Sequence, residues 1–378
     1  MPDVVIAGYA RSPFHPASKG ALAKVRPDDL AAQVVKGLVE RTGVDPTKIE
    51  DLVLGCAFPE GEQGFNMARL VVLLAGLPNS VGGITMNRFC GSSMSAVHYA
   101  AGQIALGAGD CFICGGVESM SRVPMGGFNP MPNPELAKSS HAYIAMGDTA
   151  EILADKYKID RARQEAFALA SQQKAAAAQA SGRFKDEIVP IKVGGETVSE
   201  DGTIRADTTA EGLAGLKPAF NAQGTVTAGT ASPLTDGAAA VLVCSAEFAN
   251  ANGLEVLAKV RSVAISGCAP EVMGLGPVGS SQKALQRADL ELKDMDLIEL
   301  NEAFAAQAMA VLHDLGLDEA KVNLDGGAIA LGHPLGASGA RILGKAASVL
   351  KREGAKYALA TMCIGGGQGI ATVLEAAE

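Results

Sequence analysis

Residues 86–96 read Met-Asn-Arg-Phe-Cys-Gly-Ser-Ser-Met-Ser-Ala, so a cysteine stands between a short apolar segment and a run of small residues that predicts a helix. Gly91 permits a sharp turn after Cys90, and Ser92 or Ser93 can cap the helix that follows. Free backbone N–H groups at a helix start favour negative charge, so a thiol there tends toward the thiolate. Taken alone, such a cysteine is more often a small buried side chain than a nucleophile.

The composition indicates a large α/β protein. The chain has 378 residues and is 48% hydrophobic, which is enough for an extensive core in two or three domains. It contains 45 glycines, 4% aromatic residues and no tryptophan, so the interior must depend on small aliphatic side chains and close packing of helices on a sheet. A net charge of −9 argues against a general nucleic-acid or membrane-surface binder, because both need basic faces.

The cysteines favour a reducing compartment. They number seven, an odd and widely spaced set, and we expect no signal peptide, so the cytoplasm is the predicted location. Cys111 and Cys114 have C-x-x-C spacing but lie in an apolar segment that predicts a buried strand, and no second pair completes a zinc set. No apolar run reaches the roughly 18 residues of a membrane span.

In the first third of the chain, strands alternate with helices, which predicts a mainly parallel sheet covered on both faces. The expected strands are residues 4–8, 51–55, 84–86 and 111–115, and the expected helices are 27–43, 66–75 and 93–108.

Residues 118–231 interrupt this alternation and predict an inserted region. It begins with a run rich in proline, glycine, methionine and asparagine at residues 124–134. Asp148 and Glu151 have the spacing of a capping box at a helix start, and an alanine-rich helix is expected from about residue 160 to residue 181.

From residue 256 the pattern of the first half starts again. Strands are expected at 260–267, 296–300, 357–363 and 369–374, and helices at 281–288, 303–315 and after a glycine-rich turn that follows 326–331. Residues 51–54 match 296–299, and the turn at Cys90 has a counterpart at His333. The duplication predicts two similar layered domains with a site where equivalent loops meet. The expected boundaries are 1–117 with about 232–253, an insert of 118–231, and 254–378.

Three C-terminal windows carry further candidate residues. His333 stands on a turn of glycines and proline, although a lone histidine can equally be a surface or core residue. Cys363 enters a glycine loop that could present N–H groups to an oxyanion, or could simply join two strands. Asn301 precedes an apolar helix and could be no more than its N-cap.

Together these windows resemble the thiolase family, most closely the degradative 3-ketoacyl-coenzyme A (CoA) thiolases, over essentially the whole chain. The matching stretches are residues 87–93, 115–121, 227–232 with 236–239, and the three C-terminal windows. The resemblance implies a thiolase-like fold of two duplicated, layered α-β-α-β-α halves with an inserted loop domain.

The resemblance also implies a catalytic role for each of these residues. Cys90 would attack the keto carbonyl while His333 accepts its proton, and Cys363 would protonate the departing enolate and later deprotonate CoA. The N–H groups of Cys90 and Gly365 would hold one oxyanion, and His333 with a water on Asn301 would hold the enolate oxygen. No metal and no permanently bound cofactor are implied, and CoA is a substrate.

Further assignments concern substrate binding. By the same resemblance, Ser232 would contact the pantetheine arm, Arg205 would lie near the adenine, and Met146 with Phe304 would border the acyl pocket. Arg205 could also be a solvated surface residue, and Met146 ordinary core filler.

The chain departs from the family in places. Ala145 replaces a histidine frequent in biosynthetic members, which weakens the alternative of an acetyl-CoA acetyltransferase that forms acetoacetyl-CoA by Claisen condensation. Asp325 replaces a common asparagine, from which we expect a local change of hydrogen bonding. Residues 124–146 match poorly, and substrate choice would be set there.

Two further alternatives are a non-catalytic acyl-CoA or lipid carrier and a cysteine protease. The combination of Cys90, His333 and Cys363 argues against a carrier, because binding alone needs none of them. The predicted partners are acyl-CoA and CoA, a second copy in a homodimer or homotetramer, and other β-oxidation enzymes, with no nucleic acid and no membrane.

Overall fold

The computed structural model describes residues 2–377, which form a large mixed sheet, a small two-stranded sheet and the helices around them. The strands of the large sheet are β1 (Val4–Arg11), β2 (His15–Pro16), β3 (Asp51–Gly55), β4 (Gly82–Met86), β5 (Cys111–Ser119), β8 (Thr235–Ser245), β9 (Ala258–Gly267), β10 (Leu297–Leu300), β11 (Tyr357–Ile364) and β12 (Gln368–Glu375). The small sheet pairs β6 (Ile191–Val193) with β7 (Glu196–Val198).

The strand directions confirm the predicted parallel pairing for β3, β4 and β5 but make the sheet as a whole mixed rather than mainly parallel. The order is β10-β11-β12-β9-β1-β8-β5-β3-β4, with β2 paired to β8. Only β3–β4, β3–β5 and β10–β11 are parallel among the described pairs of this sheet. The reason is local: β12 follows β11 after the short loop at Gly365, and a connection of that length permits only antiparallel pairing. The strand β8 likewise runs antiparallel to both of its neighbours, β1 and β5.

The predicted duplication is visible in the strand order. In the C-terminal half, β9-β12-β11-β10 repeats the order β1-β8-β5-β3, with antiparallel, antiparallel and parallel pairings in the same succession. The two halves meet where β1 pairs with β9, through Val5 with Lys259 and Ile6 with Ala258. The equivalent turns at Cys90 and His333 line one cavity.

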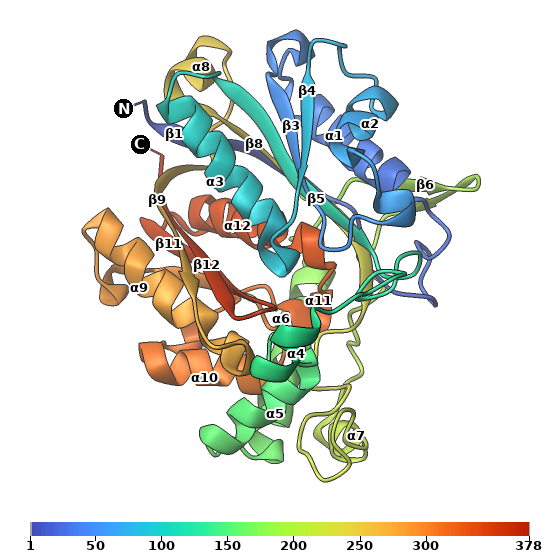
Figure 1. Cartoon of the computed structure of the whole chain (residues 1–378). Coiled ribbons are helices and arrows are strands. Elements are labelled where there is room, and N and C mark those ends of the chain that lie inside the picture. Colours follow the sequence, from blue (N-terminus) through green and yellow to red (C-terminus); the bar gives the residue numbers. More distant parts are fainter. Residues whose placement is uncertain (1, 378) are drawn as a thin grey trace.

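The helices pack between the two halves of the sheet and on their outer faces (Figure 1). They are α1 (Pro27–Thr42), α2 (Met67–Leu74), α3 (Ser92–Ala105), α8 (Ala246–Ala251), α9 (Gly276–Ala288), α10 (Ala305–Leu315), α11 (Ala328–Leu331) and α12 (Leu335–Glu353). Helices α3 and α12 share a buried core with strands of both halves, through residues such as Val97 and Leu343. Helices α1 and α2 cover the outer face of the N-terminal half, and α9 and α10 that of the C-terminal half.

Two predicted helix caps are wrong. Helix α3 has Gly91 at its N-cap, because the Ser92 hydroxyl accepts from the backbone N–H of Arg88 at 2.9 Å and the Ser93 hydroxyl accepts from Ala340 at 2.8 Å. The hydroxyls thus tie α3 to the preceding turn and to α12. The predicted capping box at Asp148 is also absent, since that helix begins two residues earlier.

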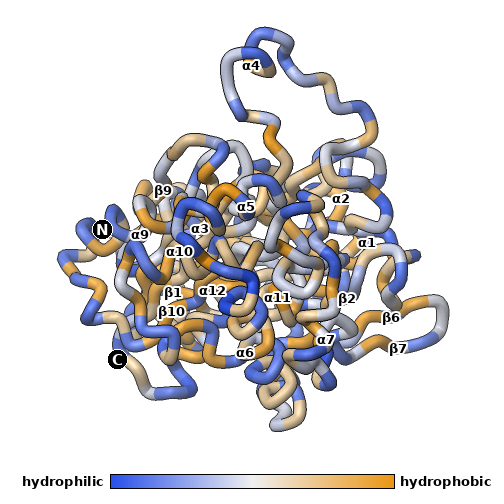
Figure 2. Tube along the Cα trace, turned by 90° about the horizontal axis from the view of Figure 1, so that it is seen from below, coloured by the Kyte–Doolittle hydropathy of each residue, from blue (hydrophilic) through white to orange (hydrophobic). Residues whose placement is uncertain are grey.

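The segment between β5 and β8 packs mainly on the C-terminal half. Its helices are α4 (Pro134–Ser139), α5 (Met146–Lys156), α6 (Arg161–Ala180) and α7 (Ala210–Ala214). Leu153 of α5 packs with Met309 of α10, and Ala175 of α6 packs with Leu331 of α11. The loop that carries α4 projects from the rest of the chain (Figure 2). The division of the chain into an insert and two flanking domains stays a prediction.

Among the described residues, no helix combines the length and apolar character that crossing a bilayer demands.

Candidate active site

One mostly apolar cavity of about 260 Å³ gathers most of the predicted site residues. Seven of the nine line it, and they come from both halves of the chain and from the segment between them: Cys90, Met146, Ser232, Phe304, His333, Cys363 and Gly365. Asn301 lies directly behind His333, while Arg205 is exposed on a turn and is not among the lining residues.

The turn that presents Cys90 is a short 3-10 helix over Phe89–Gly91. Phe89 has φ +42°, a left-handed conformation that costs a non-glycine residue about 1–3 kcal/mol and persists only where neighbours enforce it. The neighbours are visible: the Phe89 N–H donates to the Asn87 side chain at 2.8 Å, and its carbonyl accepts from the Ser92 hydroxyl at 2.6 Å. This strained turn carries Cys90 into the cavity at the start of α3.

Burial decides the protonation of Cys90. It raises the pKa of the thiol to about 11, with a further rise from Glu118, while the N–H groups of Gly365 and of Cys90 itself act in the opposite direction. Burial, followed by the neighbouring Cys90, likewise raises the pKa of Cys363. The predicted thiolate at the helix start is therefore wrong for the resting protein, because desolvation outweighs the pull of the backbone N–H groups.

His333 is placed by a glycine that no other residue can replace without strain. Gly332 has φ +95°, and a Cβ atom there would lie 2.7 Å from the side chain of Thr235. The Thr235 hydroxyl accepts from the backbone N–H of His333 at 3.1 Å. The imidazole is 4% exposed and faces the same cavity as Cys90.

Ser338 determines which imidazole nitrogen is free. The Ser338 hydroxyl donates to the carbonyl of Pro334 at 3.0 Å, so its oxygen can only accept from His333 Nδ1, which lies 2.5 Å away. The proton of the neutral ring is thereby assigned to Nδ1, and Nε2 keeps its lone pair. Burial, reinforced by the charge of Arg341, lowers the pKa of His333 to about 3, so the ring is neutral at rest.

Asn301 is not a helix cap. Helix α10 begins at Ala305 with Phe304 at its N-cap, which rules out that alternative. The Asn301 side chain is instead buried, and its Nδ2 lies 3.3 Å from His333 Nε2, where it can donate to the free lone pair.

The glycine loop after Cys363 joins β11 to β12, and its Gly365 also lines the cavity, while an oxyanion-binding role for the loop stays a prediction. Gly366 and Gly367 have φ +80° and +84°, which lets the chain reverse within three residues. The reversal directs the N–H of Gly365 toward the Cys90 sulfur, where it opposes the rise of that pKa.

The apolar walls of the cavity were largely missed by the sequence analysis. Besides Met146 and Phe304, they include Met120, Met125, Phe220, Leu234, Met273 and Leu335. The rings of Phe220 and Phe304 meet edge to face with their centroids 5.7 Å apart. Ser232 lies in this wall, with its hydroxyl donating to the carbonyl of Ala303 at 3.1 Å. These residues are distant in sequence and scattered singly, so no pattern marks them.

The contacts of Glu118 were also missed by the sequence analysis. Its buried carboxylate accepts from the backbone N–H of Ala57 at 2.8 Å and of Gly336 at 2.9 Å, and from the Gln63 side chain at 2.8 Å. It therefore ties the end of β5 to the first turn of α12, two residues after Pro334. Its signal was a single acidic residue at the end of an otherwise apolar strand.

Within residues 2–377, no group of three or more histidine, cysteine or acidic side chains has the geometry to hold a metal ion.

Comparison with known proteins agrees with this geometry. Residues 4–247 match the thiolase N-terminal domain and residues 254–376 match the thiolase C-terminal domain, so the chain belongs to the thiolase family. A 3-ketoacyl-CoA thiolase of Bacillus subtilis is 50% identical over 99% of this chain and 100% of its own length, and one of Aliivibrio fischeri is 51% identical with the same coverage. The acetyl-CoA acetyltransferase structure of Bacillus anthracis superposes with a TM-score of 0.92 at 41% identity, covering 100% of this chain and 99% of its own.

Proposed function

We propose that the protein cleaves 3-ketoacyl-CoA with CoA, giving acetyl-CoA and an acyl-CoA shortened by two carbons, through an acyl-cysteine on Cys90. The observation that carries the proposal is the meeting of two cysteines and one neutral histidine in a single apolar cavity. The names of the relatives at 50–51% identity support the same substrate.

In the first step, the Cys90 sulfur attacks the 3-keto carbonyl while its proton passes to His333 Nε2. The raised pKa of Cys90 and the lowered pKa of His333 make a resting ion pair unfavourable, so proton transfer accompanies bond formation. The N–H groups of Cys90 and Gly365 stabilise the alkoxide that forms.

In the second step, the alkoxide collapses and the carbon–carbon bond breaks. The electron pair leaves as the enolate of acetyl-CoA, whose oxygen is held by the imidazolium and by a water on Asn301. Cys363 donates its proton to the enolate carbon and becomes a thiolate. An elevated thiol pKa suits this donor, because the proton is retained until a strongly basic carbanion forms.

In the third step, the thiol of a second CoA gives its proton to the Cys363 thiolate and attacks the acyl group on Cys90. Collapse of that intermediate expels the Cys90 sulfur, which recovers its proton from the His333 imidazolium. Both cysteines and the histidine return to their starting states, so no metal or bound cofactor is needed.

Substrate binding follows the cavity walls. Met146 and Phe304 border the acyl chain and Ser232 meets the pantetheine arm, while Arg205, which lies outside the cavity, is proposed for the adenine end. We infer that the protein acts as a cytoplasmic homodimer or homotetramer, in association with other enzymes of fatty acid β-oxidation.

A second candidate is an acetyl-CoA acetyltransferase that runs the same steps backwards on two acetyl-CoA molecules. The likeness to the Bacillus anthracis structure favours it, whereas Ala145 in the cavity wall argues for the degradative role.

A chain-length series tests both candidates. Purified protein is given CoA with 3-ketoacyl-CoA substrates of four to sixteen carbons, and loss of the 3-keto absorbance is followed. We expect consumption, with longer substrates preferred. No consumption at any length would refute the thiolase activity, and a preference for the four-carbon substrate would favour the acetyltransferase. A Cys90→Ala sample controls for non-enzymatic loss.

A further inference from the structure

Two elements hold the His333 imidazole between them. Asn301, just after β10, reaches Nε2, and Ser338, in α12, reaches Nδ1. Glu299 precedes Asn301 by two residues, so the two side chains lie on the same face of the strand. Arg341 follows Ser338 by three residues, so it lies one turn along the same face of α12, and helical side chains lean back toward the N-terminus.

A buried ion pair closes this arrangement. Arg341 Nη1 donates to Glu299 Oε2 at 3.2 Å, and both side chains are about 1% exposed. A continuous circuit results: from His333 through Ser338 and along α12 to Arg341, across to Glu299, and along β10 through Asn301 back to His333.

We propose that Arg341 is a positioning residue for the His333 base: its ion pair with Glu299 holds α12 against β10 and so keeps Ser338 and Asn301 at the two imidazole nitrogens. The proposal rests on the proposed role of His333 as the base for Cys90. It assigns no contact between Arg341 and the substrate.

Stability alone does not account for this pair. Arg341 Nε and Nη2 have no protein hydrogen-bond partner although both atoms are buried. The guanidinium therefore regains only part of the hydrogen-bond free energy that it loses on leaving water. Replacing such an imperfect buried pair with apolar residues of similar size is often neutral or stabilising. Orientation of the adjacent imidazole supplies a reason for the pair.

The charge of Arg341 also helps to keep the His333 imidazole neutral. It disfavours the imidazolium and, after burial, is the second cause that lowers the pKa of His333. Burial raises the pKa of Glu299 to about 7, so below that pH the positive charge of Arg341 is less compensated. The other charged or titratable groups that act on the Arg341–Glu299 pair are Tyr9, Glu302, Asp325 and Lys345.

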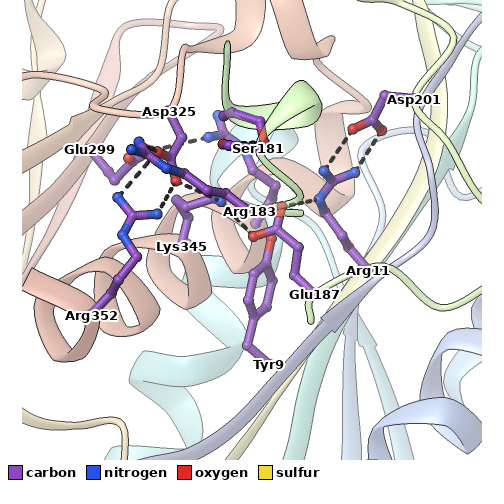
Figure 3. A network of polar contacts seen from close by, with 12 residues as sticks. Tyr9, Arg11, Ser181, Arg183, Glu187, Asp201, Glu299, Asp325, Lys345 and Arg352 are labelled. Atoms are coloured by element: carbon purple, nitrogen blue, oxygen red, sulfur yellow. Dashed lines mark hydrogen bonds and ion pairs between the residues drawn. The ribbon is translucent and has the colours of Figure 1, made fainter. Parts of the chain in front are cut away.

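Lys345 supplies a matched control on the same helix. It lies one turn beyond Arg341, is also buried, and pairs with Glu187 at 2.5 Å and Asp325 at 3.3 Å. Figure 3 shows Lys345 between these two carboxylates, in a network that continues through Glu187 to Arg11. Its ion pairs go to Glu187 and Asp325 and not to Ser338 or Asn301, so its loss removes a buried cation that acts on Glu299 through its charge alone and leaves the contacts around His333 in place.

The test compares Arg341→Gln, the double variant Arg341→Met with Glu299→Met, and Lys345→Met. The double variant removes both charges, so it is expected to fold even if Arg341→Gln, which strands a buried carboxylate, does not. The measurements are kcat and the KM for CoA, and the pKa of the His333 imidazole, followed by NMR on protein with isotope-labelled histidine across the transition near pH 3.

We expect both Arg341 variants to lower kcat by about tenfold or more, with the KM for CoA within about twofold, because a misplaced base slows the chemical step. In both Arg341 variants, removal of the positive charge should raise the pKa of the His333 imidazole above its value of about 3 by about one pH unit. Lys345→Met should lower the melting temperature and leave kcat and the His333 pKa near the parent values.

A folded double variant with parental kcat and an unshifted His333 pKa would overturn the proposal, as would equal effects in Lys345→Met. The imidazole titration uses no thioester, so it decides the role of Arg341 even if the parent protein fails to cleave any 3-ketoacyl-CoA. That second failure would count against the proposed function alone.

Discussion

Ser338 Oγ lies 2.5 Å from His333 Nδ1 and donates its own proton to the carbonyl of Pro334 at 3.0 Å. The hydroxyl can therefore only accept from the imidazole, which leaves Nε2 unprotonated beside the cavity that holds Cys90. A serine five residues after the histidine thus selects the tautomer that can act as a base.

Replacing Ser338 with alanine should impair the chemical step more than folding. We expect kcat to fall roughly tenfold to a hundredfold, because the tautomer and ring orientation are no longer fixed, and the free energy of unfolding to fall by about 1 kcal/mol. Thiolysis kinetics and thermal melting measure the two effects. Ser280→Ala is the control, since the Ser280 hydroxyl is also buried and donates to a helical carbonyl, that of Gly276. A loss of kcat of equal size in the control would contradict the assignment.

Cys90→Ala should retain CoA binding and lose turnover. The truncation removes the nucleophile but leaves the apolar walls and the Gly365 loop in place. Calorimetric titration with CoA measures binding, and mass spectrometry after incubation with 3-ketoacyl-CoA detects the acyl-enzyme in the parent protein. Persistent turnover, or acylation of another residue in the parent, would refute Cys90 as the nucleophile.

The alkylation rate of Cys90 should rise continuously with pH. Because burial raises the pKa of this thiol to about 11, the thiolate fraction should increase about tenfold per pH unit from pH 7 to pH 10. The pKa of His333, near 3, places imidazole protonation below this range. Iodoacetamide kinetics measure the profile, with a small-molecule thiol of pKa about 8.5 as the reference that levels off earlier. A plateau at neutral pH would reveal a resting thiolate–imidazolium pair instead.

Gly332→Ala should destabilise the protein and displace the base. The position has φ +95°, and the new Cβ would meet the Thr235 side chain at 2.7 Å, so we expect a loss of about 1–3 kcal/mol together with reduced kcat. Denaturant unfolding and steady-state kinetics report the two changes.

The matched control for that substitution is Gly102→Ala. Gly102 lies exposed within α3, and an added Cβ there meets no atom within 4 Å. Alanine should stabilise this helix by about 0.5–1 kcal/mol and leave kcat unchanged. Equal tolerance of alanine at both glycines would show that the turn before His333 is not constrained.

Much of the fold was predictable because local sequence patterns, such as apolar runs between turn residues, correspond directly to strands in the structure. The strand at 51–55 and the long C-terminal strand at 357–363 were expected within a residue of their observed bounds, since both are apolar runs between turn signals. The duplication was predictable from the match between residues 51–54 and 296–299, and the strand order repeats accordingly.

Strand direction and protonation were not predictable in the same way. Cys363 pairs with Gly369 in an antiparallel ladder because the glycine loop between the two strands is short. The strand–helix alternation elsewhere in the chain does not predict this direction. The state of Cys90 depends on how much water the cavity excludes, and a helix start alone says nothing of that. Asn301 could not be separated from an N-cap until the start of α10 was located at Ala305.

By itself, the sequence determined the α/β layers and, through its resemblance, the family, and it marked Cys90, His333 and Cys363 as candidate catalytic residues, because glycine-rich turns and small-residue helices leave local signatures around them. Only the tertiary structure decided that these residues share one cavity, that Ser338 sets the imidazole tautomer, and that the Arg341–Glu299 pair closes the circuit around it. The reason is physical: burial and side-chain pairing set pKa values and side-chain orientation, and burial depends on segments far apart along the chain, such as those of Glu299 and Arg341, which are 42 positions apart.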